Sequence, residues 1–535
     1  MKQLNNINNM KGIRFFVAVL LLAVSACTTD DFEESYADPS KISTSSVEKQ
    51  FAGFLASNRE YVVPSYWNYF VVLRTTVNRY TQAVGWVNST AQYVPGAGLI
   101  TNRWDNYYAL LAQFRELEKI YAQLPEAEQA DKRIFMIAAK IYLYDHTQKV
   151  VDLHGDIPFS EAGRLSANGG DYQVSFPAFD DAEAIYTTML DDLKAFASEL
   201  NLITIPDPIQ AGFSTQDFIN DGDLDKWRKY CNSLRLRMLT RVSKAASFQS
   251  RADSEIASVL ADPSAFPVVT DNADNIRIDI QDLNSAINAT GFRTGLEDWN
   301  GNIAGKAMID QMLNTSDPRL RVLFEPGAKA GGVYKGLDPL LAASDQQQLV
   351  DGGTIAIYNR STLSRNQFFP GILITAAEVN FLIAEYYLKA GNDGAAETAY
   401  NNGIAASVEQ YYQIRSVSND NTAGDVAPVT AGEIVSYLNE PGISWSNAAD
   451  MDEKLRRLAV QKWLHFNVVQ PIEGWAELRR LDLPNLTFQV DNSNAQELPP
   501  YRWLYAQSEN TYNTANYNMV RANDNLMTRI FWDVE

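Results

Sequence analysis

The sequence predicts a mainly helical protein whose helices are interrupted by one irregular, loop-rich subdomain. In several long segments apolar residues recur every three or four positions, which is typical of amphipathic helices. Between about residues 266 and 369 this period is lost, and Gly, Asn, Asp and Ser gather around short β-favouring runs such as 354–358. We therefore expect helices on both sides of an irregular insertion.

Four long helices are expected before the insertion. The first carries an apolar stripe from Trp104 to Leu124 and ends before Pro125, and the others span about 132–146, 182–200 and 227–242. In the last of these, apolar residues follow one another at spacings of four, three, four and four, and Cys231 is one of them. We expect Cys231 to be a buried core thiol rather than a reactive one.

One helical hairpin is expected after the insertion. Residues 376–409 contain a helix, a turn at 391–394 and an alanine-rich helix with small residues at close-packing positions. This segment has the length of a tetratricopeptide hairpin. The sequence alone shows one such hairpin clearly and does not establish a regular array.

Composition and charge restrict the class of protein. Of 535 residues, 46% are hydrophobic and 21% charged, which is typical of a large globular protein. With 45 Lys and Arg against 65 Asp and Glu, the formal net charge is −20. Nucleic acid is therefore not an expected partner, because binding a phosphate backbone needs a basic surface. The two cysteines exclude a site of paired CxxC motifs, and the three histidines form no HExxH motif.

The N-terminal 26 residues have the pattern of a secretory signal peptide. Lys2, Lys11 and Arg14 precede ten apolar residues at 15–24, which are too few to span a bilayer as a mature helix. The tetrad 24–27, Val-Ser-Ala-Cys, resembles a bacterial lipobox. That resemblance implies cleavage before Cys27, a diacylglycerol on its sulfur and an acyl chain on its amine. The alternative is an ordinary signal peptide followed by a chance cysteine.

Residues 27–50 are predicted to be a lipidated acidic tether before the main domain at 51–535. Asp30, Asp31, Glu33 and Glu34 lie directly behind Cys27, and no apolar period is present. The acidic cluster resembles the signal that exports some lipoproteins to the outer face of the outer membrane. A merely solvated acidic linker is the alternative.

The sequence contains few signs of catalysis. There is no GxSxG motif, and the segment 301–306 has the wrong glycine spacing for a phosphate-binding loop. Two carboxylates suffice for glycoside hydrolysis, so a glycosidase stays open as an alternative. Asp221, Asp223 and Asp225 alternate like calcium ligands, but the rest of an EF-hand is missing. Helix capping explains Asp223 and Asp225 more simply, and we expect no metal or cofactor, with calcium as the remaining alternative.

Seven segments together resemble the SusD/RagB family of nutrient-binding lipoproteins, particularly its SusD-like branch. They occur in order at 104–120, 151–162, 222–241, 317–324, 370–385, 461–484 and 500–517. One departure is His154, where the family more often has an aromatic residue. The resemblance implies a SusD-like fold with four tetratricopeptide-like hairpins and an irregular part that faces the ligand. It also implies a partner, a SusC-like TonB-dependent transporter over whose mouth the protein sits as a lid, and an oligosaccharide ligand or, in some members, a peptide.

Aromatic residues outside helical stripes are the candidates for sugar contact. Their faces cover the C–H patches of a sugar ring, while planar polar side chains form hydrogen bonds with its hydroxyl groups. The candidate ligand residues are Trp86, Asn88, Tyr93, Asp298, Trp299 and Asn300. The alternative is that these rings fill the core of the irregular subdomain. The tryptophans inside the family segments, at 104, 227, 463 and 475, are expected in the core.

The resulting prediction is a non-catalytic surface lipoprotein of the outer membrane, anchored in it by lipid. It would capture a nutrient, most simply an oligosaccharide, for the transporter. A surface glycan-degrading enzyme and a scaffold or adhesin without a small ligand are the alternatives.

Overall fold

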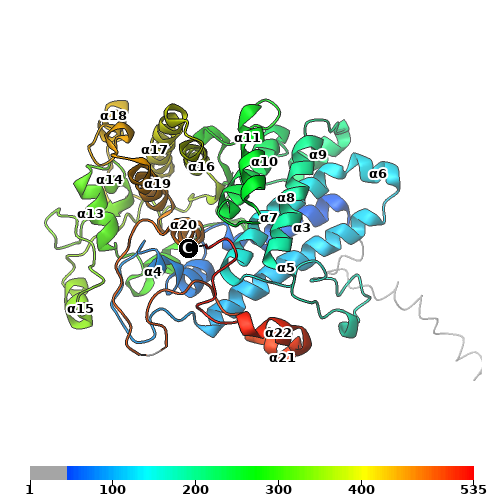
Figure 1. The fold of residues 1–535 in the computed structure, drawn as a ribbon, viewed down its shortest axis with the longest axis horizontal. Helices are drawn as coiled ribbons and strands as arrows, with labels where there is room; N and C mark the ends of the chain where they lie inside the picture. The colour runs from blue at the N-terminus through cyan, green and yellow to red at the C-terminus, as the bar shows by residue number, and fades with distance from the viewer. Residues whose placement is uncertain (1–44, 494, 535) are drawn as a thin grey trace, which may run out of the picture. The chain divides into compact units, whose positions relative to one another are not determined.

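The computed structural model describes residues 45–493 and 495–534 (Figure 1). The chain divides into two units at Ser46 and Val47. The predicted signal peptide, Cys27 and the acidic cluster behind it lie outside the described residues. Everything below concerns the second unit.

The predicted tether ends earlier than residue 50. Helix α3 (Val47–Ser57) begins at Val47, and its residues Val47, Phe51, Phe54 and Leu55 are buried along one side. The ring of Phe51 lies 5.3 Å from the ring of Phe135. The four residues 47–50 therefore belong to the domain, because an apolar stripe starts within the stretch that was predicted to be solvated.

All four helices predicted before the insertion are present as α5 (Ala97–Ala122), α7 (Arg133–His154), α8 (Ala182–Glu199) and α10 (Leu224–Val242). Helix α7 is longer than predicted because Val150, Val151 and Leu153 continue its buried surface. It ends at Gly155, whose φ of 79° breaks the helix. Shorter helices accompany them: α4 (Val77–Tyr80), α6 (Glu126–Asp131), α9 (Asp207–Gln216) and α11 (Gln249–Ala261).

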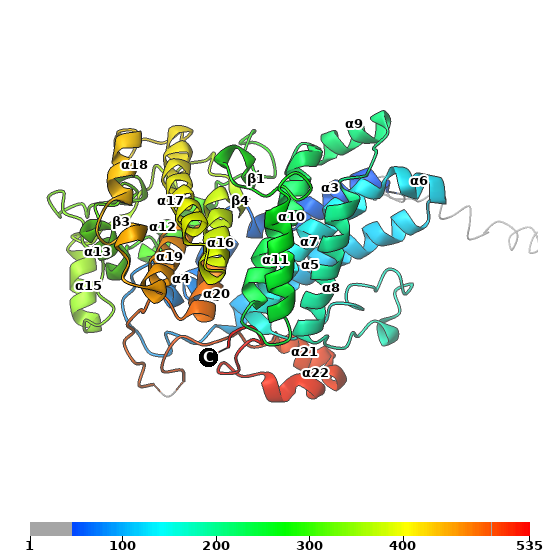
Figure 2. The ribbon, with the colours of Figure 1, turned by 45° about the horizontal axis from the view of Figure 1, so that its top comes forward.

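The predicted hairpin is formed by α16 (Ala376–Lys389) and α17 (Asp393–Ser416), and α17 extends seven residues beyond 409. A side chain at Gly403 would place its Cβ 2.5 Å from the Phe381 ring, so the two helices approach closely there. The remaining helices of this half are α18 (Ala431–Leu438), α19 (Met451–Phe466) and α20 (Pro471–Leu481) (Figures 1 and 2). Helix α5 packs against α3 and α7, α10 against α8 and α11, α16 against α17 and α19 against α20.

The predicted loop-rich insertion contains only short elements. They are α12 (Phe292–Glu297), α13 (Lys306–Asn314), α14 (Leu320–Leu323) and α15 (Ala343–Asp351). Strand β1 (Ile276–Ile278) pairs antiparallel with β4 (Gly371–Ile374), and β2 (Phe324–Glu325) pairs antiparallel with β3 (Ile357–Tyr358). Two short helices, α21 (Gln507–Tyr512) and α22 (Thr514–Val520), lie near the C-terminus.

The tryptophans expected in the core, at 104, 227, 463 and 475, are buried, and so is Cys231. Cys231 lies in the core as predicted, and burial raises the pKa of its thiol to about 12. Asp223 caps α10 by accepting hydrogen bonds from the backbone N–H groups of Asp225 and Lys226, as predicted.

A group of buried charges joins five helices. Arg237 and Arg241 of α10 reach carboxylates on α7, α16 and α20. Arg480 of α20 pairs with carboxylates on α16 and on its own helix. We call this group the buried ion network; its members are Asp145, Asp152, Arg237, Arg241, Glu378, Glu385, Lys462, Glu473, Glu477 and Arg480. Such a network fixes the relative positions of helices, because every charge in it depends on its partners.

Candidate functional site

Trp299 is the most strongly exposed aromatic ring among the predicted ligand residues. It follows α12 in a short 3₁₀ turn, Asp298–Asn300, and 80% of its surface is accessible to solvent. Its backbone is left-handed, with φ 56° and ψ 36°, and Asn300 also has φ 56°. Asparagine tolerates this conformation, whereas for tryptophan it costs roughly 1–2 kcal/mol. An exposed ring on strained backbone is typical of a functional site rather than of a packing position.

Three further aromatic residues extend from Trp299 across the surface. The Tyr66 and Phe70 rings are stacked with centroids 4.9 Å apart, and the Trp67 ring, 49% exposed, lies 6.1 Å from Tyr66. The Phe70 ring meets the Trp299 ring edge-on at 6.2 Å. We call Tyr66, Trp67, Phe70 and Trp299 the aromatic ridge. Trp67 and Trp299 are the exposed rings of this ridge, whereas Tyr66 and Phe70 are half-buried and cover each other.

Two glycines bring the two halves of this ridge together. Trp67, Phe70 and their neighbours form a π-helix (Trp67–Leu73) that packs against α12. A Cβ at Gly291 would lie 2.8 Å from the Tyr66 nitrogen, and a Cβ at Gly295 would lie 2.9 Å from the Ser65 carbonyl oxygen. Only glycine permits this approach, so these residues position the turn that carries Trp299 beside the π-helix.

A pocket of about 180 Å³ opens beside Trp299. Its lining includes Arg74, Arg79, Trp86, Trp299, Asn300 and Gln347. We call it the Trp299 pocket. Trp86 is 7% exposed and its indole N–H donates to Gln92 Oε1 at 2.9 Å, so it contributes to the pocket wall without standing free as a platform. The structure thus brings together three of the predicted residues: Trp86, Trp299 and Asn300.

The other three predicted residues do not line the Trp299 pocket. Tyr93 has no exposed surface, its hydroxyl donates to the Gln489 carbonyl at 2.8 Å, and burial raises its pKa to about 12. The Asn88 side-chain amide donates to the Pro339 carbonyl at 2.7 Å. Asp298 is exposed in the same turn as Trp299 but outside the lining. The alternative that a ring fills the core holds for Tyr93, and Asn88 ties chain segments together.

Sequence reasoning missed the π-helix part of the ridge. Residues 66–70 read Tyr-Trp-Asn-Tyr-Phe, and Tyr69 of this segment is buried while Trp67 is exposed. Rings on both sides of one helix exceed what a single core-facing stripe needs. That excess was the signal in the sequence that could have found the ridge.

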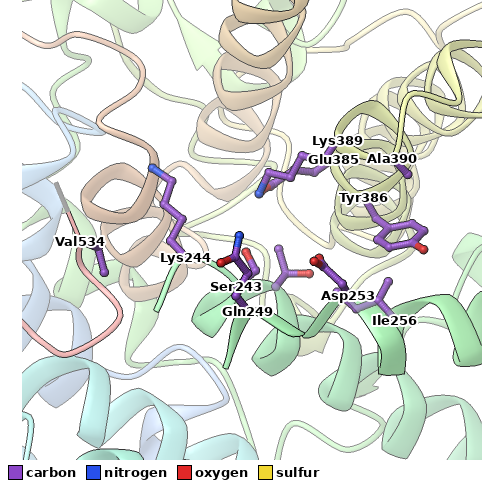
Figure 3. Close-up of a pocket in the computed structure, with 11 residues that line it drawn as sticks. Ser243, Lys244, Gln249, Asp253, Ile256, Glu385, Tyr386, Lys389, Ala390 and Val534 are labelled. Atoms are coloured by element: carbon purple, nitrogen blue, oxygen red, sulfur yellow. The ribbon is translucent and has the colours of Figure 1, made fainter. Parts of the chain in front are cut away.

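A larger cavity, of about 610 Å³, lies among α10, α11 and α16. Figure 3 shows Lys244, just after α10, and Lys389, at the end of α16, beside it together with Asp253 and Tyr386. Burial, with the cations of Arg480 and Lys389, lowers the pKa of Lys244. Tyr386 is the one aromatic ring in its lining. The Trp299 pocket is therefore the better candidate for sugar contact.

In the part of the chain that the structure describes, no three His, Cys, Asp or Glu side chains are grouped so that they could hold a metal ion. Within the same residues, no helix combines the length and apolarity needed to cross a bilayer.

Comparison with known families identifies the fold. Residues 46–506 match the family model SusD-like_2, described as starch-binding associating with outer membrane. The chain belongs to the SusD-like family. A search of curated proteins finds no match.

Solved structures of SusD-like proteins have the same fold. A chitin-binding protein aligns with a TM-score of 0.70 at 21% identity, over 91% of this chain and 100% of its own. A chitin-binding SusD homologue from Flavobacterium johnsoniae gives 0.69 at 23% identity, over 91% and 99%. A SusD homologue from Bacteroides fragilis gives 0.69 at 20% identity, over 92% and 100%. These matches confirm the predicted mainly helical SusD-like fold, and the family model confirms the predicted family.

Proposed function

We propose that this protein is a non-catalytic surface lipoprotein that captures an oligosaccharide at the Trp299 pocket and the aromatic ridge. In this proposal it passes the ligand to a SusC-like TonB-dependent transporter. The observation that carries the proposal is Trp299, an exposed ring held in left-handed backbone beside three other rings. The names of the relatives, which include starch and chitin binding, agree with a carbohydrate ligand.

Binding of an oligosaccharide requires contact with more than one aromatic ring. A tryptophan face that covers on the order of 100 Å² of sugar supplies about 2.5 kcal/mol before the entropic cost of association. One such face binds weakly, so several must act on one ligand. Trp67 and Trp299 are the two exposed rings, and Tyr66 and Phe70 connect them through ring contacts. An oligosaccharide of several units could contact both tryptophans.

The chemistry of the pocket supports binding without cleavage. A glycosidase usually needs two carboxyl groups flanking the scissile bond, about 5–9.5 Å apart. The described residues that line the Trp299 pocket include no aspartate and no glutamate. We therefore propose that a bound glycan leaves this site intact.

The anchor and the partner complete the proposal. Acylation of Cys27 with two or three chains would hold the protein on the membrane almost permanently, since each buried methylene contributes about 0.8 kcal/mol. The acidic residues behind it, Asp30 to Glu34, support export to the cell surface. Delivery to a transporter requires a stable complex, and interfaces of obligate size bury more than about 2,000 Å².

Titration of the Trp299→Ala variant tests the capture step. Isothermal titration with malto-, chito- and acidic oligosaccharides should identify a ligand of the wild-type protein. Trp299→Ala should then lower the affinity for that ligand about tenfold or more, because the substitution removes one stacking face. Tyr512, 74% exposed on α21, provides the matched control, and Tyr512→Ala should leave affinity unchanged. Equal affinities of wild type and Trp299→Ala would refute this site.

Purification in mild detergent at endogenous expression tests the delivery step. We expect the protein to be recovered together with a TonB-dependent barrel of roughly 100 kDa. An interface of obligate size would keep the two proteins bound through purification. Recovery of the lipoprotein alone would count against delivery while leaving the capture step standing.

A further inference from the structure

Two arginines face the Trp299 pocket without a carboxylate partner. Arg74 follows the π-helix, and its guanidinium carbon lies 4.3 Å from the centre of the Phe70 ring and 5.7 Å from that of Trp299. Arg79, on α4, lies 6.0 Å from the centre of the Trp86 ring. Among the described residues, neither guanidinium forms an ion pair, and the Arg79 Nε atom is buried without a hydrogen-bond acceptor.

Several buried arginines of this protein meet carboxylates; examples are Arg237, Arg241, Arg319 and Arg480. Among the described residues, Arg103, Arg479 and Arg502 are buried without an ion pair. Arg479 and Arg502 donate to backbone carbonyl groups, and none of the three lines the Trp299 pocket. In a chain of net charge −20, acidic partners are plentiful. Two adjacent unpaired cations at a pocket therefore call for an explanation.

The two cations also act on each other. Burial, followed by the neighbouring Arg74, lowers the pKa of Arg79 to about 10, and burial lowers the pKa of Arg74. No carboxylate raises either value. Like charges in a partly desolvated site destabilise each other, and an anion placed between them would relieve this repulsion.

We propose that the pocket binds an anionic oligosaccharide, whose carboxylate or sulfate lies between Arg74 and Arg79 while a sugar face stacks on Trp299. This inference rests on the proposed function and names its ligand class. A guanidinium presents paired N–H donors that match the oxygens of either anion. The rim favours a sugar over a peptide, because the exposed Trp299 ring stands beside the polar side chain of Asn300.

Among the described residues, the carboxylate of Asp351 accepts a hydrogen bond from a side chain of the pocket lining without lining the pocket itself. The Gln347 amide donates to Asp351 Oδ1 at 2.8 Å. Asp351 is exposed at the end of α15 and is not among the lining residues. Gln347 is thus held in place by Asp351, while the space beside the two arginines stays open to a ligand.

Matched pairs of glycans separate charge from sugar shape. Oligogalacturonides carry carboxylates that their methyl esters lack, and chondroitin sulfate oligosaccharides carry sulfates that their desulfated forms lack. We expect one of the two charged glycans to bind at least about tenfold more tightly than its control, as the loss of a charge-assisted hydrogen bond predicts. The pair that shows the difference identifies the anion. Binding of the charged form should also weaken as salt rises.

Three variants assign the effect to the pocket. Arg74→Gln and Arg79→Gln should each lower the affinity for the charged glycan about tenfold and leave the affinity for the uncharged form unchanged. Arg293, exposed on α12 outside the lining, is the control, and Arg293→Gln should have no effect. The melting temperatures of all variants show whether each one is folded. If Arg79→Gln is unstable, Arg74→Gln alone decides the test, because Arg74 is the less buried of the two arginines.

The outcomes distinguish this inference from the proposed function. If uncharged glycans bind through Trp299 and Arg74→Gln changes nothing, the anionic ligand is refuted and the capture of sugars stands. If no glycan binds at all, both fail. If a hexaglutamate peptide binds in an Arg74-dependent manner and no glycan does, the ligand is an acidic peptide and the inference is overturned as well.

Discussion

Replacing Arg237 by methionine tests whether the buried ion network stabilises the helical scaffold. Arg237 is almost fully buried; it contacts Asp145 at 2.9 Å, Glu378 at 2.8 Å and the Leu373 carbonyl at 2.8 Å. Asp145 keeps Lys149 at 2.7 Å and the Tyr230 hydroxyl at 2.8 Å after the change. Glu378 loses its cation. Leaving a buried charge uncompensated costs about 3–5 kcal/mol.

The pH dependence of this loss follows from Glu378. Burial already raises the pKa of Glu378, and Arg237 opposes that rise. Without Arg237 the pKa in the folded variant increases further above its unfolded value. A carboxyl group shifted in this direction stabilises the fold at low pH and loses that contribution as pH rises. The deficit of Arg237→Met should therefore grow between pH 5 and pH 8.

Calorimetry of a double variant isolates the charge. Glu378→Gln removes the uncompensated charge in the Arg237→Met background and keeps the shape of the side chain. We expect the double variant to recover about 1–3 kcal/mol of the loss at pH 8, because the desolvated charge is gone. A double variant no more stable than Arg237→Met would refute the reasoning and assign the loss to packing alone.

Three further predictions concern the site, the anchor and metals. Trp299→Gly should be more stable than Trp299→Ala by about 0.5–1 kcal/mol in calorimetry, because only glycine relieves the left-handed backbone; equal stabilities would argue against strain. Cys27→Ala should move the protein from the membrane fraction to the soluble fraction, and retention in the membrane would exclude acylation of this residue as the anchor. A chelator should leave the melting temperature unchanged, because Asp223 caps α10 and Asp225 pairs with Lys229 at 2.8 Å; a lower melting temperature would instead indicate a bound cation.

The long helices were predictable because each buries one continuous apolar face, and burial imposes a period on the sequence. Their ends were less predictable. Helix α7 passes His146 and α3 begins before residue 50, since buried residues continue across positions whose polarity suggested an end. The buried ion network was not predicted, although α10 carries arginines at 235, 237 and 241 on a helix that is almost entirely buried. A period shows which residues face inward but not which distant carboxylates meet them.

The candidate site was predicted in part. Trp299 stands in a polar segment, so its exposure followed from local composition. Tyr93 lies in a similar Gly- and Pro-containing segment but is buried, because distant residues such as Gln489 cover it. Local sequence does not contain that contact. Arg74 and Arg79 drew no attention as isolated cations, since the missing carboxylates are a property of the folded neighbourhood.

The arrangement of these features bears on how ligand specificity is encoded. Solved relatives share this fold at 20–23% identity, so packing tolerates extensive substitution once buried faces and close contacts are kept. The Trp299 pocket is built differently: its ring comes from a strained turn in the irregular insertion, and its cations come from the segment around α4. Neither part contributes to the buried ion network. Under the proposed function, a substitution of Arg74, the less buried of the two cations, would alter the ligand class with little effect on the scaffold. Arg74 is in that case more informative about the ligand than the fold is.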